Sequence, residues 1–496
     1  MNNHPDYLKE CREQEWRVEL RKSMKAKERT ALERVKMPEH EPEVRSRDHR
    51  EVNIGLSEEQ AVVEAKRCLD CADPTCISGC PVGINIPAFI KNIERGAFLE
   101  SARVLKETNT LPAVCGRVCP QEVQCEEACF YARKLHLLPV AIGNLERFAA
   151  DYERNSGKIS IPETEKSNGI KVAIIGSGPA GLAAAADMAR LGYSVTVFEA
   201  LHELGGVLKY GIPEFRLPNE IVDVEIDNLK KMGVSFHTNF VVGKTADLDD
   251  LRKEGYRAFF IGSGAGLPRF MNIPGENYIG IFSSNEYLTR VNLMNAAKEE
   301  YDTPVLFGRK VAVIGGGNTA MDSVRTARRL GAEKAMIIYR RTEEEMPARK
   351  EEIKHAREEG IEFHMLSNPV EYFADQNGRV NRMRIQKMKL GEPDSSGRRR
   401  PIPIEGSEYD TEVDLVVVSV GVSPNPLIPS SVKELEVTRW GTLVVDKESM
   451  QTNIPELFAG GDIVRGGATV ILAMGDGRKA AAGMHKTITD NVLNKK

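Results

Sequence analysis

The pattern of apolar and polar positions changes after residue 169. Two stretches, residues 171–200 and 310–341, each pass from a short apolar segment through a glycine-rich turn into a helical segment that ends at Leu-Gly, and then into a second apolar segment. Short apolar runs that alternate with helical segments predict parallel β-strands joined by crossover helices. Because the two stretches nearly superimpose, the sequence predicts an α/β chain with two separate domains of one design.

The first 160 residues lack this pattern. Short helical stretches alternate with Pro/Gly turns, and residues 57–60 read as a capping box that starts a helix. We therefore predict an all-α domain over residues 1–160, with the polar residues 156–169 as a linker. Residues 1–50 mix Lys, Arg and Glu densely, which favours a solvated helix or a partly ordered arm over a docking element.

Composition excludes several classes of partner. The chain has 496 residues and a formal net charge of −4, which gives no electrostatic reason to expect nucleic acid or an anionic membrane. No secretory signal is visible at the start, and no run approaches the ~20 apolar residues of a membrane helix. We expect a cytoplasmic chain with neither nucleic acid nor membrane as a partner.

Eight of the nine cysteines lie in two runs. The runs read Cys68-x2-Cys71-x4-Cys76-x3-Cys80-Pro81 and Cys115-x3-Cys119-Pro120-x4-Cys125-x3-Cys129. Disulfide frameworks belong to small secreted domains, and zinc sites usually contain separate Cys-x2-Cys pairs. Short gaps that end in Cys-Pro are typical of iron–sulfur loops. Iron–sulfur clusters are therefore favoured over zinc and over structural or redox thiols, and the domain is predicted to carry electrons.

The first repeated unit contains a phosphate-binding turn. Its Gly176-x-Gly178-x-x-Gly181 motif follows a strand and opens a helix, which is the context that makes this motif specific. The helix N-terminus offers free N–H groups and a positive dipole end to a pyrophosphate. Glu199 ends the second strand, where a carboxylate suits ribose hydroxyls.

Further segments favour FAD over NAD at this first site. A Gly-Gly pair, residues 205–206, stands where flavoproteins bring the backbone close to the cofactor, and residues 259–265 read as a strand and glycine turn of a flavin domain. Residues 457–462 form an apolar strand followed by Gly-Gly-Asp, before a helix expected to start near residue 469. Residues 209–213 are expected to line the flavin. The predicted FAD residues are Gly176, Gly178, Gly181, Glu199, Gly206, Arg216, Gly461, Asp462 and Thr469.

The second repeated unit differs where its second strand ends. Gly315, Gly317 and Ala320 form its phosphate turn, but Arg340 and Arg341 replace the acidic residue. Arginine presents a planar fork of donors to a phosphate, so this site is predicted to bind NADPH through its 2′-phosphate. A solvated basic pair is the alternative.

The order of the segments predicts a nested arrangement. Residues 414–421 look like the strand that leads back from the second unit. We therefore predict an NADPH domain over residues 301–426, inserted into a discontinuous FAD domain over residues 161–300 and 427–496.

Three long segments carry a resemblance to a known family: residues 205–218, 388–403 and 467–481. With them, the chain resembles the small, NADPH-oxidising subunit of bacterial glutamate synthase and its relatives. Among these it looks especially similar to the large subunit of NADH-dependent reduced ferredoxin:NADP oxidoreductase and to homotetrameric glutamate synthase-like chains. The N-terminal half of dihydropyrimidine dehydrogenase is a more distant relative with a similar cysteine layout.

The resemblance implies two 4Fe–4S clusters with interleaved ligands. One cluster would be held by Cys68, Cys71, Cys76 and Cys129. The other would be held by Cys80, Cys119, Cys125 and a non-cysteine ligand, for which Glu146 is the candidate and a surface helix glutamate the alternative. Cys115 is expected to be an unligated thiol.

These sites together predict an electron path from NADPH through FAD and the clusters to an outside acceptor, or the reverse. No side chain need act as acid or base in hydride transfer between bound cofactors, so no catalytic residue is assigned. The absence of a Cys pair in the nucleotide domains disfavours a disulfide mechanism. The expected partner is a large glutamate synthase subunit or a small flavoprotein or ferredoxin, in an oligomer. The alternatives are a stand-alone homo-oligomeric oxidoreductase and a scaffold without turnover.

Overall fold

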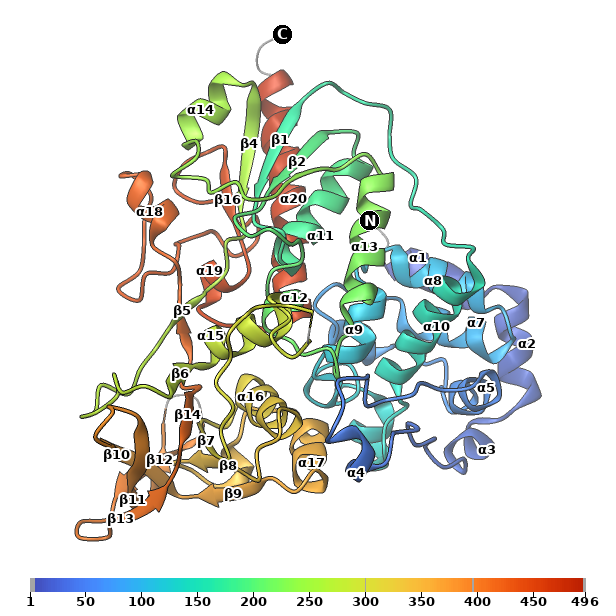
Figure 1. Ribbon diagram of the computed structural model, residues 1–496. Helices are drawn as coiled ribbons and strands as arrows, with labels where there is room; N and C mark the ends of the chain where they lie inside the picture. The colour runs from blue at the N-terminus through green and yellow to red at the C-terminus, as the bar shows by residue number, and fades with distance from the viewer. Residues whose placement is uncertain (1–4, 299, 395–396, 494–496) are drawn as a thin grey trace.

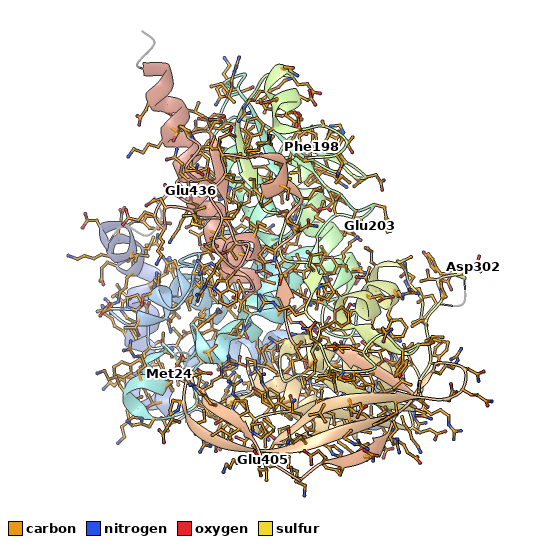
Figure 2. All side chains as sticks on the ribbon, turned by 90° about the vertical axis from the view of Figure 1, so that its left-hand side faces the viewer. Met24, Phe198, Glu203, Asp302, Glu405 and Glu436 are labelled. Carbon is orange, nitrogen blue, oxygen red and sulfur yellow. The ribbon has the colours of Figure 1, made fainter. Side chains whose placement is uncertain are left out.

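The computed structural model describes residues 5–298, 300–394 and 397–493. Figure 1 shows a helical N-terminal body beside two α/β bodies, one at the top and one at the bottom of the view. In the view of Figure 2, Phe198 lies in the upper body, and Glu405 lies at the opposite, lower edge of the molecule. The helical domain, the first sheet and the second sheet thus form three neighbouring units.

In its described residues, the N-terminal domain consists of helices and loops with one isolated β-bridge, as the all-α prediction requires. Ser57 caps its fifth helix, because the Ser57 hydroxyl accepts from the backbone N–H of Gln60. The helices are α1 (Pro5–Arg12), α2 (Glu15–Ser23), α3 (Ala26–Thr30), α4 (Pro42–Arg45), α5 (Glu58–Lys66), α6 (Thr75–Ser78), α7 (Ile86–Glu94), α8 (Phe98–Lys106), α9 (Pro112–Val118), η1 (Gln121–Val123), the π-helix η2 (Tyr131–Leu135) and α10 (Ile142–Ser156).

The charge-dense N-terminal segment is not a solvated arm, which corrects the expectation from its composition. Three of its arginines, Arg17, Arg29 and Arg45, are at most 2% exposed. Arg17 pairs with the buried Asp70, and Arg29 lies 2.9 Å from Glu94. Arg45 pairs with Glu358 and Glu359 at the end of helix α17 (Lys350–Glu358), in the second α/β body. A buried charge requires such a partner, so these ion pairs explain why a polar segment packs.

The first sheet has five parallel strands in the order β16-β4-β1-β2-β3. The central strand β1 carries only apolar side chains after its first residue, and these are fully buried between the layers. The strands are β1 (Lys171–Ile175), β2 (Ser194–Phe198), β3 (Ser235–His237), β4 (Tyr256–Ile261) and β16 (Leu457–Ala459). Its helices are α11 (Pro179–Arg190), α12 (Val207–Tyr210), α13 (Asn219–Lys231), α14 (Leu248–Lys253), α18 (Leu427–Ser431), α19 (Asp462–Arg465) and α20 (Val470–Leu493). The late strand β16 confirms that this domain is discontinuous.

The second sheet also has five parallel strands, in the order β6-β14-β7-β8-β9. Its first strand, β6, precedes residue 301, so the second domain begins earlier than the sequence placed it. The strands are β6 (Ile281–Ser283), β7 (Lys310–Ile314), β8 (Lys334–Tyr339), β9 (Glu362–Met365) and β14 (Leu415–Val418). Its helices are α15 (Ser284–Leu288), η3 (Thr289–Leu293), α16 (Asn318–Arg329), η4 (Glu343–Glu345) and α17 (Lys350–Glu358). A three-residue strand such as β6 is too short to show periodicity in the sequence.

An antiparallel sheet extends the second domain, and a short ribbon joins the two domains. The antiparallel strands are β10 (Ser367–Ala374), β11 (Val380–Pro393), β12 (Arg399–Pro403) and β13 (Tyr409–Glu412). The ribbon pairs β5 (Leu267–Pro268) with β15 (Val422–Ser423). The chain passes between the two domains at β5 and again at β15, so these two connecting segments lie side by side. Within the described residues, no helix combines the length and the apolar character that a membrane span requires.

Candidate functional site

The first glycine turn is closed by packing at two positions and open at the third. A Cβ on Gly176 would lie 2.5 Å from the carbonyl oxygen of Gly262, and one on Gly181 would lie 2.0 Å from the carbonyl oxygen of Gly176. A Cβ on Gly178 would meet no atom within 4 Å. Gly178 directly precedes α11, so the open space lies where the helix N–H groups point. Packing therefore explains two of these glycines, whereas Gly178 borders open space at the N-terminus of α11.

Glu199 is fixed at the end of β2 by the same turn. Its Oε2 accepts from the backbone N–H and the hydroxyl of Ser177 at 2.8 and 2.6 Å, and its Oε1 accepts from the backbone N–H of Leu201. Gly206, with φ of +55°, lies against Gly178. The carboxylate and both glycine loops therefore meet at one edge of the first sheet.

The segment that follows β16 reaches the same edge, with Asp462 in its short helix α19. Burial raises the pKa of Asp462 to about 6, opposed by the backbone N–H of Ala468. Gly461 donates its N–H to Asp476, which also binds Arg465 at 2.6 Å. Asp476 was not among the residues predicted from the sequence, although it stands between two glycines within a helix, and such glycines are a sign of close packing.

Helix α20 starts directly after Thr469, as predicted, and packs against α11 of its own domain and against the N-terminal domain. A Cβ on Gly477 would lie 2.1 Å from the carbonyl oxygen of Ala180 in α11. A Cβ on Gly475 would lie 3.0 Å from the carbonyl oxygen of Pro81, in the N-terminal domain. The start of α20 is thus held between the first nucleotide turn and the cysteine region.

The second glycine turn repeats the geometry of the first. Gly315 has φ of +143°, and a Cβ there would lie 2.3 Å from the carbonyl oxygen of Ser419. A Cβ on Gly317 would have Pro347 at 3.9 Å as its nearest neighbour, so this position is open like Gly178. Ala320 is completely buried.

The two arginines at the end of β8 differ in their surroundings. Arg341 is buried, and it donates to the carbonyl oxygen of Arg399 at 2.8 Å and to Asp394 at 2.9 Å. Arg340 is exposed and makes no ion pair within the part of the chain that the structure describes. Although the side chain of Arg340 reaches solvent, partial desolvation and the charges of the neighbouring Arg341 and Arg398 lower its pKa. Of this pair, only Arg340 has its guanidinium available to a ligand.

Two cations expected near the flavin have protein partners. Arg216 lies 2.7 Å from Asp322 and 3.0 Å from Glu352, both in the second domain. Lys209 lies 2.5 Å from Asp223 and 2.8 Å from Glu203. The sequence did not predict these pairs, which join residues up to 136 positions apart (Arg216 and Glu352).

Four cysteines from both runs line one pocket in the N-terminal domain, and we call them the outer set: Cys68, Cys71, Cys76 and Cys129. Except for these thiols, the lining is mostly apolar. Burial raises the pKa of Cys68 to about 12, and burial and the charges of the other three raise the pKa of Cys76. Four thiolates facing one apolar pocket repel each other, so this donor set fits a positively charged iron centre.

The remaining predicted ligands form a deeper group, which we call the inner set: Cys80, Cys119, Cys125 and Glu146. Burial raises the pKa of Cys80 to about 12, and the charges of Glu146 and Cys119 add to it. Burial, then Glu126, Cys80, Glu146 and Cys119, raises the pKa of Cys125. These mutual effects require proximity. Three thiols with one carboxylate fit a cluster that has a non-cysteine ligand.

Glu146 is not a surface glutamate. It is 4% exposed, and burial raises its pKa to about 8. Its Oε1 accepts from the Asn109 side chain at 2.7 Å. Cys115 is also buried, with its Sγ 3.6 Å from Asn109 Oδ1 and 3.6 Å from Met474 Sδ. Asn109 thus contacts both, and Cys115 faces the first α/β domain.

The inner set lies next to α20, which belongs to the first α/β domain. Gln124, beside Cys125, donates to Thr469 at 3.5 Å. Arg478 of α20 donates to the carbonyl oxygens of Val82 and Thr108 at 3.0 and 2.5 Å. The helical domain therefore packs on the first α/β domain beside the inner set, and the first α/β domain contacts the second through Arg216.

Comparison with known proteins matches both parts of the chain. The family described as dihydropyrimidine dehydrogenase domain II, 4Fe-4S cluster, matches residues 45–158, and the pyridine nucleotide-disulphide oxidoreductases match residues 170–477. The glutamate synthase [NADPH] small chain of Azospirillum brasilense is 39% identical over 457 residues, or 91% of this chain and 94% of that one. The chain belongs to the glutamate synthase small-chain family. It is an oxidoreductase with an N-terminal 4Fe–4S domain, and the predicted resemblance and fold class are confirmed.

Proteins with other names are also similar to this chain. The NADP(+)-dependent formate dehydrogenase subunit beta of Moorella thermoacetica is 39% identical over 82% of this chain and 59% of that one. Among solved structures, Mycobacterium tuberculosis FprA in complex with NADPH has a TM-score of 0.55 at 21% identity, over 66% of this chain and 86% of that chain. At that identity the likeness concerns the fold alone.

Proposed function

We propose that this small-chain family member passes electrons between NADPH, bound at the second turn, and a partner protein, through FAD at the first turn and two 4Fe–4S clusters. The observation that supports it best is the packing of the sites, in which residues beside the inner set contact α20 of the first α/β domain, and the outer set lines a pocket in the same helical domain. NADPH releases two electrons as hydride, and clusters accept one at a time. Bound FAD supplies the conversion between them.

The residues of the chain bind and orient in this scheme. Gly178 and Gly317 leave room for the two pyrophosphates, Glu199 accepts from the FAD ribose, and Arg340 donates to the 2′-phosphate of NADPH. The contacts of Arg216 with Asp322 and Glu352 hold the second domain against the first. Positioning of two cofactors contributes to rate because hydride transfer needs near-contact geometry.

The outer set would hold one cluster through four thiolates, and the inner set would hold the other through three thiolates and the Glu146 carboxylate. A carboxylate differs from a thiolate in charge and basicity, and such differences tune cluster potentials. The two clusters are therefore expected to have different reduction potentials. Reduced thiolates suit the cytoplasm, where we place the chain.

We infer that the chain works with a partner subunit, because its relatives are named small chains or beta subunits. We propose a large glutamate synthase subunit, or a small flavoprotein or ferredoxin, as the acceptor. A stand-alone homo-oligomer that reduces its own acceptor is the competing proposal. In each case the isolated chain is expected to oxidise NADPH with an artificial dye and to form no glutamate from glutamine and 2-oxoglutarate.

The test is anaerobic purification of the whole chain, followed by flavin and iron analysis and a dye-reduction assay. We expect one FAD and about eight iron atoms per chain, as two 4Fe–4S clusters require. Cys76→Ser should remove the iron of one cluster, Cys119→Ser the iron of the other, and Cys115→Ser none. Failure of flavin-loaded protein to reduce a dye with NADPH would overturn the proposal, and iron retained in both ligand variants would overturn the ligand assignment.

A further inference from the structure

An apolar surface lies beside the outer set. It comprises residues 130–138, which include the π-helix η2. Leu135, Leu137 and Leu138 are 37%, 47% and 69% exposed, and Phe130 is 40% exposed. Single exposed apolar residues are ordinary, but four within nine residues form a concentrated patch of the kind that marks interaction sites.

The backbone beneath this surface is held in place. The buried Tyr131 donates its hydroxyl hydrogen to the carbonyl oxygen of Arg67 at 2.7 Å, and the Arg67 guanidinium lies 4.9 Å from the Tyr131 ring centroid. Arg67 also donates to the carbonyl oxygens of Leu138 and Pro139 at 2.6 and 2.9 Å. The leucines are therefore presented on an anchored scaffold, and this lowers the ordering cost of binding a partner.

The surface is continuous with the outer set. Phe130 and Tyr131 line the same pocket as the four cysteines, and Cys129 directly precedes them. A protein seated on residues 130–138 would therefore cover the wall of that pocket. No other predicted redox site has so many exposed apolar residues adjoining its ligands within the described part of the chain.

The charge of the surface indicates the kind of partner. Arg133 and Lys134 are both exposed, and neither has an ion pair within the described residues. His136 is exposed between the leucines. Complementary charge selects a partner and speeds encounter, so an acidic face is favoured. A second copy of this chain, packed symmetrically, would instead place these cations against themselves.

We propose that residues 130–138 dock an electron-carrying protein whose contact face is apolar at its centre and acidic at its rim. This proposal rests on the proposed function, because it uses the outer set as the exit for electrons. The leucines supply the buried centre of the contact, and Arg133 and Lys134 orient the partner.

The test uses the tagged full chain in its native cells, with a photoreactive amino acid in place of Leu138. We expect cross-linking to an acidic protein that carries flavin or iron–sulfur. Lys134→Glu and Leu137→Asp should each reduce the adduct by roughly tenfold or more, since charge reversal and loss of an apolar anchor both weaken a small interface. The matched control is Val437→Asp, because Val437 is 48% exposed and lies elsewhere.

The outcomes separate this proposal from the proposed function. Dye reduction by NADPH and iron content should be unchanged in all three variants. An adduct with a second copy, with a lipid or nucleic acid, or with a protein without a redox cofactor would overturn the docking proposal, as would no adduct or equal adducts in all variants. Loss of NADPH-dependent dye reduction from the unsubstituted protein would instead overturn the proposed function.

Discussion

The two glycine-turn units of this chain share the geometry of the turn but differ in the residue at the end of their second strand. In both, the first glycine has a positive φ and lies against the backbone of a neighbouring strand end, and the second glycine faces open space. The units differ at the third position, Gly181 against Ala320, and at the end of the second strand, Glu199 against Arg340. The shared part fits a pyrophosphate, and we propose that the differing part selects the nucleotide.

The third position shows how tightly each helix packs. In the first unit a Cβ at Gly181 would lie 2.0 Å from a backbone oxygen, whereas the second unit already accommodates the buried Ala320. The helix of the second unit must therefore stand slightly farther from its turn. The same motif thus tolerates different helix–strand distances, while the open middle glycine is kept.

The largest effect is expected from Gly181→Ala. The new methyl group would overlap the carbonyl oxygen of Gly176, and overpacking of this kind costs about 1–3 kcal/mol or more. Helix α11 must then move away from the turn, and most FAD should be lost on purification, as measured by flavin absorbance of the denatured protein. The matched change Ala320→Gly should retain FAD and lose about 1 kcal/mol of helix stability. Full flavin content in the alanine variant would contradict the packing argument.

A second large effect is expected from Gly317→Val. The side chain would fill the space left open at this turn, so NADPH should reduce the flavin at least about tenfold more slowly at subsaturating concentration, a loss of about 1.4 kcal/mol. Reduction by dithionite serves as the control and should be normal, with FAD retained. The same substitution at Gly178 should instead release FAD. An equal effect of both substitutions on FAD would show that the two turns do not bind different nucleotides.

Arg340→Ala should have an intermediate effect. Hydrogen bonds to a charged group contribute about 1.5–3 kcal/mol, so KM for NADPH should rise by roughly one to two orders of magnitude, while KM for NADH stays the same. Lysine at this position should restore part of the preference. Arg341→Ala should lower thermal stability without changing the ratio of the KM values for NADPH and NADH. The reason is that Arg341 is held by Arg399 and Asp394. Loss of the preference for NADPH in the Arg341 variant alone would show that Arg341, and not Arg340, contacts the 2′-phosphate.

The smallest effect is expected from Glu199→Gln. The amide retains one acceptor but brings donors toward the N–H and hydroxyl of Ser177, and one neutral hydrogen bond contributes about 0.5–1.5 kcal/mol. FAD affinity, measured by recovery of flavin fluorescence on dilution, should fall by up to about tenfold. NADPH preference should not change. An unaltered FAD affinity would show that Glu199 does not bind the ribose.

Local patterns predicted strands β1, β2, β4, β7, β8, β14 and β16, the glycine turns and the start of α20, because each depends on a few adjacent residues. They did not predict that Arg17 and Arg29 are buried, since their acidic partners lie 53 and 65 positions away. They did not predict the burial of Arg45 either, since two of its three acidic partners lie over 300 positions away. The second domain begins before residue 301 for a similar reason. Strand β6 becomes a strand only by pairing with β14.

The sequence by itself determined that this chain contains two dinucleotide turns of one design and a cysteine-rich helical domain, because short-range spacing encodes backbone turns and helix starts. Only the tertiary structure decided that Cys68, Cys71, Cys76 and Cys129 line one pocket, that Arg341 is engaged while Arg340 is available, and that α20 contacts Cys115. These facts depend on side chains brought together from distant segments, and burial then fixes their charge partners. The physical reason is that local geometry is set by neighbours in the chain, whereas burial and electrostatics are set by neighbours in space.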